Sequence, residues 1–135
     1  MDMELYITKH RIIQDYLKRI TELTSSPIAR PEAQLIAEMI NKMTGVLNMH
    51  LASEDNYVYP KLLKHPDEKI RSITQNYMKE MRGLSAAYSD FYKSYNTPSK
   101  ITADPEGYKA AFKAVNEALT LRIKREESEL YTFAT

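Results

Sequence analysis

Apolar residues recur at intervals of three and four along most of the chain, a spacing that gathers side chains on one face of an α-helix. Strand-like alternation does not stand out and only three glycines occur, so the pattern predicts helices throughout. The predicted helices cover residues 3–24, 31–62, 67–95 and 105–132. Two of their connections are short, so neighbouring helices are expected to run antiparallel. The sequence therefore predicts an all-α fold, an up-down-up-down four-helix bundle.

The positions of prolines and of one tyrosine add to the prediction of where these helices begin, end and are buried. Pro31 and Pro105 begin predicted helices, where a missing N–H breaks no hydrogen bond. Pro60 lies near the end of the second helix and is expected to kink or terminate it. Tyr57 continues the apolar stripe of that helix and is expected to be buried. The stretch from Asn96 to Pro105 forms the long connection, no internal repeat is recognised, and residues 1–135 are expected to form one domain.

Five strongly polar residues stand on stripes that otherwise face the core: His10, His50, Glu54, Arg122 and Glu126. His50–Glu54 and Arg122–Glu126 are i,i+4 pairs, so the members of each pair share one helix face. Buried imidazoles and carboxylates without partners are costly, so such a cluster needs a compensating cation. A divalent metal ion and the guanidinium of Arg122 are the two candidates. Packing in the core or at the surface is the alternative for His10 taken alone.

The neighbours of this cluster follow from helix heights and helix phase. If the second and third helices fold back near His65, Met81 comes level with His50, and Tyr77 comes level with Glu54. The acidic residues that directly follow the two glutamates lie about 100° further around their helices. They are expected beside the cluster or at the surface: Asp55 and Glu127.

Charge and cysteine content narrow the class of function. Nineteen basic and eighteen acidic residues give a net charge of +1 without a Lys/Arg cluster, so neither nucleic acid nor a membrane surface is an expected partner. The absence of cysteine excludes zinc–thiolate sites, iron–sulfur clusters and a cysteine nucleophile, and favours a cytoplasmic location. Neither a Ser-His-Asp arrangement nor a phosphate-binding glycine loop is visible, so no catalytic residue is assigned.

Nitrogen and oxygen donors without thiolate suit iron, manganese or zinc. The Glu-x-x-His motif of ferritin-like di-iron proteins does not occur at any of the three histidines. Instead the segments KHRIIQDYL, HLASEDNYVYPKL and LRIKREESELY together resemble the hemerythrin-like (HHE) family over nearly the whole chain. The resemblance implies a hemerythrin-like bundle whose metal ligands in this chain are His10, His50, Glu54 and Glu126.

The same resemblance shows where the chain departs from its family. Positions at which the family carries histidine are occupied here by Tyr77, Met81 and Arg122. These three lost ligands belong to one of the family's two irons, whereas the matching histidines belong to the other. The resemblance therefore implies one bound iron or none, with manganese or zinc as alternatives. A phenolate from Tyr77 is a further candidate ligand for a ferric ion, and Met81 is a poor one for a hard ion.

Three functions remain open from the sequence. The first is a degenerate non-haem iron protein that binds or senses iron, dioxygen or a related small diatomic species. The second is a metal-free regulatory or protein-interaction module in which Arg122 replaces the charge of the metal. The third is a non-haem iron enzyme, which needs an open coordination position. A protein partner and a homo-oligomer are both left undetermined.

Overall fold

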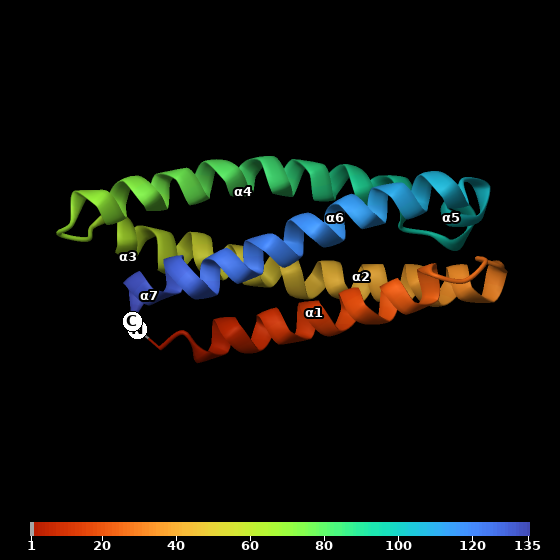
Figure 1. Ribbon diagram of the computed structural model, residues 1–135, viewed down its shortest axis with the longest axis horizontal. Coiled ribbons are helices and arrows are strands. Elements are labelled where there is room, and N and C mark those ends of the chain that lie inside the picture. Colours follow the sequence, from red (N-terminus) through yellow and green to blue (C-terminus); the bar gives the residue numbers. More distant parts are fainter. Residues whose placement is uncertain (1) are drawn as a thin grey trace.

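The computed structural model describes residues 2–135 as an antiparallel bundle of long helical rods (Figure 1). The rods are α1 (Glu4–Thr24); α2 (Arg30–Ser53) continued by η1 (Glu54–Val58) and α3 (Tyr59–Leu63); α4 (Glu68–Tyr95); and α6 (Pro105–Arg125) continued by η2 (Glu126–Leu130) and α7 (Tyr131–Ala134). No strand occurs within residues 2–135. The prediction of an all-α bundle is confirmed, and the boundaries agree closely with those read from the sequence.

The long connection holds an additional short helix, α5 (Pro98–Ala103), which the sequence analysis did not predict. The side chain of Thr97 caps it by accepting the backbone N–H of Lys100, and Pro98 lies in its first turn. Ile101 is fully buried against the main core. The cap, the first-turn proline and the buried isoleucine together stabilise this short helix.

Two π-helical turns, η1 and η2, interrupt the second and fourth rods. Each inserts one residue, which rotates the buried face by about 100°. The prediction that Tyr57 is buried is therefore wrong: it is 62% exposed, whereas Val58 and Tyr59 are buried. Pro60, which was expected to kink or terminate the helix, does not terminate it: it lies in the first turn of α3, directly after η1, and the rod continues to Leu63.

Two apolar clusters fill the interior of the bundle and leave a polar layer between them. The larger cluster includes Ile13 and Ile123, and the smaller one includes Leu130 together with Met3 and Ala134 from the two ends of the chain. The ends lie beside each other at one end of the bundle (Figure 1). Along the fourth rod, the buried residue between Ile123 and Leu130 is Glu126, so this functional candidate lies inside the bundle.

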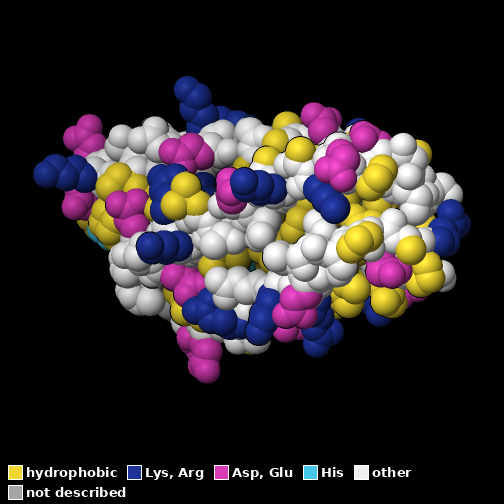
Figure 2. Space-filling view, turned by 45° about the vertical axis from the view of Figure 1, so that its right-hand side comes forward, with side chains coloured by type: hydrophobic (Ala, Val, Ile, Leu, Met, Phe, Trp, Pro, Cys, Tyr) yellow, Lys and Arg dark blue, Asp and Glu magenta, His cyan; other side chains and the backbone are white. Residues whose placement is uncertain are grey.

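The outer surface carries charges of both signs. Figure 2 shows basic and acidic side chains interspersed with apolar ones on the face that it presents. Among residues 2–135, no helix combines the length and the apolar character that a membrane crossing requires.

Candidate metal centre

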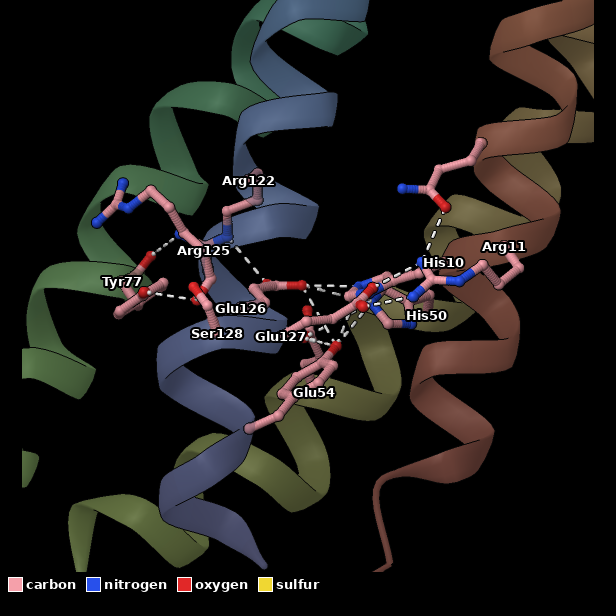
Figure 3. Close-up of polar contacts among 12 residues, drawn as sticks. His10, Arg11, His50, Glu54, Tyr77, Arg122, Arg125, Glu126, Glu127 and Ser128 are labelled. Atoms are coloured by element: carbon pink, nitrogen blue, oxygen red, sulfur yellow. Dashed lines mark hydrogen bonds and ion pairs between the residues drawn. The ribbon is translucent and has the colours of Figure 1, made fainter.

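Four buried side chains from three helical rods converge in the polar layer: His10, His50, Glu54 and Glu126. One potential donor atom from each lies within 4.8 Å of the others, and all four residues are at most 4% exposed. The Nε2 atoms of the two histidines are 3.1 Å apart, and His10 Nε2 is 2.9 Å from Glu126 Oε1 (Figure 3). The structure thus brings together the four residues that the sequence singled out.

Both carboxylates of the cluster stand at the start of a π turn. In η1 the backbone N–H of Tyr59 bonds to the carbonyl of Glu54, and in η2 that of Tyr131 bonds to the carbonyl of Glu126. Each of these bonds spans five residues instead of four, and such turns within helices are frequent at functional sites. The extra residue returns the fifth residue after each glutamate to the buried face, so Tyr59 and Tyr131 both point inward.

Tyr131 is a site residue that the sequence analysis missed. Its hydroxyl donates a hydrogen bond of 2.7 Å to Glu54 Oε2 and lies 3.3 Å from Glu126 Oε1. The same oxygen is 3.1 Å from Nε2 of His10 and 3.3 Å from Nε2 of His50. A single phenol oxygen therefore contacts all four members of the cluster.

The signal that would have revealed it is an internal repeat, which the sequence analysis did not recognise. HLASEDNYVY and RIKREESELY share a glutamate at position five, an acidic residue after it and a tyrosine at position ten. In the structure, the tyrosine of each copy forms a hydrogen bond with a residue of the other copy. Tyr131 donates to Glu54 of the first copy, and Tyr59 accepts a bond of 2.8 Å from Nη2 of Arg122 in the second.

Glu127 and Asp55 were expected either beside the cluster or at the surface. Glu127 lies beside the cluster, whereas Asp55 is exposed. Glu127 Oε2 is 2.7 Å from His10 Nδ1, and Arg11 holds the same carboxylate. Partial burial would raise the pKa of Glu127, but hydrogen bonds to Arg11 and His10 lower it overall. A charged carboxylate at Nδ1 favours the tautomer that carries its proton there, which leaves Nε2 free to bind a cation.

Arg122 occupies the other side of the Glu126 carboxylate. Its Nε donates a 2.9 Å bond to Glu126 Oε2, while Glu126 Oε1 faces His10. Its Nη1 donates to the carbonyl of Tyr77, and the guanidinium lies 4.7 Å from the centre of the Tyr77 ring. Arg122 thus forms an ion pair with Glu126, whereas Glu54 Oε1 is buried without a hydrogen-bond partner.

The two substituted positions on α4 lie differently from each other. Met81 lines a cavity of about 10 Å³ together with both histidines and Glu126, a volume close to that of one water-sized probe. The Tyr77 hydroxyl instead donates a 2.7 Å bond to Glu129. Tyr77 lies on the same side of the fourth rod as Arg122 and Arg125 (Figure 3). Met81 therefore borders the cluster, whereas the phenol oxygen that enters it belongs to Tyr131.

The pKa values of the two buried carboxyl groups are shifted in opposite directions. Burial and the neighbouring Glu126 raise the pKa of Glu54 well above its ordinary value. Burial also opposes ionisation of Glu126, but hydrogen bonds with His10 and His50 and the charge of Arg122 outweigh it and lower the pKa of Glu126. The folded cluster thus binds a proton on Glu54 more tightly than an exposed carboxyl group would, and a cation that binds there replaces this proton.

Comparison with known proteins identified one family. The family model described as "Hemerythrin HHE cation binding domain" matches residues 2–134. The matched stretch contains every residue of the polar layer. No curated protein and no solved structure matches the chain.

Proposed function

Because the chain belongs to the hemerythrin HHE cation-binding domain family, we propose that its polar layer holds a single non-haem metal ion. The match confirms the resemblance inferred from the sequence. The observation that supports the proposal is the convergence of four buried donor atoms within 4.8 Å. Two imidazoles and two carboxylates suit iron, with manganese and zinc as alternatives. The ligands in this proposal are His10, His50, Glu54 and Glu126.

We propose one ion and not two because of Arg122. Its guanidinium holds the Glu126 oxygen that faces away from the histidines, at 2.9 Å, where a permanent charge stands in place of a second cation. A single bound ion supplies Lewis-acid or one-electron chemistry. The role in this proposal is binding or sensing of iron, or of dioxygen or another small diatomic species.

The first prediction concerns metal content. Protein loaded with ferrous iron under anaerobic conditions and freed of excess metal is expected to retain about one ion per chain. Glu54→Gln removes an anionic donor and should reduce this content severalfold. Asp55→Asn is the matched control, since Asp55 is the adjacent but exposed carboxylate, and it should leave the content unchanged. Elemental analysis decides the matter: two ions per chain, or none, is incompatible with the proposal.

The second prediction concerns the pH dependence of stability after removal of metal by a chelator. Because the pKa of Glu54 is raised by folding, its contribution to stability is complete below its unfolded value of about 4.3 and is lost as pH rises through its folded value. Glu54→Gln keeps this side chain neutral at every pH. Urea unfolding at pH 5 and pH 8 should therefore show the variant gaining stability relative to the wild type as pH rises. A difference that is the same at both pH values would contradict the assignment.

A second candidate function is a metal-free interaction or regulatory module. The observation that favours it is that Arg122 is only 6% exposed and already pairs with Glu126. Under this alternative the polar layer is a structural network completed by the Tyr131 hydroxyl. The metal analysis above separates the two functions, because the module requires no ion for folding or for partner binding.

A further inference from the structure

The hydroxyl of Tyr131 is placed where it could add a fifth donor atom to the four of the proposed metal site. Its hydroxyl oxygen lies 2.7, 3.1, 3.3 and 3.3 Å from donor atoms of Glu54, His10, His50 and Glu126. Metal–ligand bonds of about 2.1 Å place adjacent ligands of a square pyramid or an octahedron about 3 Å apart. The oxygen is thus spaced from all four donors as a fifth ligand would be from its four neighbours.

Several separations between the four donors themselves are close to these values, and His50 Nε2 and Glu54 Oε2 are somewhat further apart at 3.6 Å. His10 Nε2 is 3.1 Å from His50 Nε2 and 2.9 Å from Glu126 Oε1, as adjacent ligands would be. The distance from His50 Nε2 to Glu126 Oε1 is 3.8 Å, which approaches the separation of about 4 Å expected across such a square. The Tyr131 oxygen lies within 3.3 Å of a donor atom of each of the four residues, so it would be within reach of an ion held by them.

The ring of Tyr131 is held in this position by its surroundings. It is 2% exposed and stacks on the His10 ring at 5.3 Å between centroids, with an interplanar angle of 13°. The Tyr6 ring meets it edge-on at 5.9 Å. The helical turn that carries it is tied to the second rod by Lys61, whose Nζ donates to the carbonyl of Ala134. The phenol is therefore placed before any ion binds, which lowers the cost of its use as a ligand.

We propose that Tyr131 is the fifth ligand of the metal centre and binds ferric iron through its phenolate oxygen. This inference rests on the proposed metal site. On binding, the O–H bond of Tyr131 breaks, an iron–oxygen bond forms and the proton leaves to the buffer, so no electron is transferred. A phenolate oxygen is a hard anionic donor, which suits Fe(III) better than Fe(II), Mn(II) or Zn(II). The fifth ligand therefore strengthens binding of the oxidised state of iron.

The experiment is visible absorption and resonance Raman spectroscopy of protein loaded with ferric citrate and freed of excess iron. The wild type should show a phenolate-to-iron charge-transfer band, and excitation within that band should enhance tyrosine ring modes. Tyr131→Phe should lose the band and bind ferric iron more weakly by roughly tenfold or more, with zinc affinity little changed. Tyr59→Phe is the matched control, since Tyr59 holds the same place in the other copy of the repeat, and it should keep the band.

The outcomes separate this inference from the proposed function. Wild-type protein that holds one ferric ion without the band overturns the role of Tyr131 and leaves the four-ligand site intact. Wild-type protein that holds no iron overturns this inference, and protein that holds no iron, manganese or zinc overturns the proposed function as well. A band that persists in Tyr131→Phe and disappears in Tyr77→Phe would show that Tyr77 is the ligand, which overturns our proposal for Tyr131. If Tyr131→Phe does not fold, ring-deuterated tyrosine in the wild type tests for phenolate, and Tyr59→Phe and Tyr77→Phe identify the residue by elimination.

Discussion

Replacing Arg122 by alanine is expected to destabilise the chelator-treated protein by roughly 3–5 kcal/mol, the usual cost of removing one partner from a buried ion pair. Arg122 is 6% exposed and is hydrogen-bonded to Glu126, Tyr59 and the carbonyl of Tyr77. Its loss leaves the Glu126 carboxylate buried without its permanent countercharge. Thermal and urea unfolding should register the change, with a melting temperature lower by roughly 10–20 °C.

Arg125 provides the matched control for this prediction. It is 41% exposed, pairs with Glu80, and its guanidinium lies 4.9 Å from the centre of the same Tyr77 ring. Arg125→Ala should cost less than about 1 kcal/mol, because exposed pairs are screened by water. The double variant Arg122→Ala/Glu126→Gln should recover part of the loss, since the unpaired charge is then gone. Equal effects of the two single arginine variants would show that Arg122 does not act as a buried countercharge.

The second large effect is expected on metal stoichiometry. Arg122→His frees the Glu126 oxygen that the guanidinium now holds and supplies an imidazole in its place. Met81→His supplies another imidazole, from α4, beside the small cavity that both histidines and Glu126 line. Together the two changes restore two of the three histidines that the family carries and this chain lacks. The double variant should bind about two iron ions per chain where the wild type binds about one.

Stability gives an independent measure of the same change. The double variant should be weakened when metal-free and should regain stability when metal is added, by about 2.7 kcal/mol at a metal concentration one hundred times the dissociation constant. Met81→His alone is the control, because it keeps the guanidinium of Arg122 and should remain at one ion. A double variant that still holds a single ion would show that Arg122 is not what limits the site to one metal.

The sequence by itself determined the bundle and identified the two histidines, the two glutamates and the arginine of its polar layer. Helix periodicity is a local property, so the three/four spacing identified the faces of all four rods and the polar residues that interrupt them. Glu54 and His50 share a face because they are one turn apart, whatever surrounds them. The departures at Tyr77, Met81 and Arg122 were likewise readable, since they depend only on position along a helix.

Tertiary structure alone decided how the layer is completed. A π turn is a local departure with poorer intrinsic geometry than the α-helix, and it persists where packing compensates for it. The turns after Glu54 and Glu126 therefore could not be read from periodicity, which is why Tyr57 was placed inside and Tyr131 was overlooked. The contact between Tyr131 and Glu54 joins residues 77 positions apart, and only the folded bundle brings their oxygens to 2.7 Å.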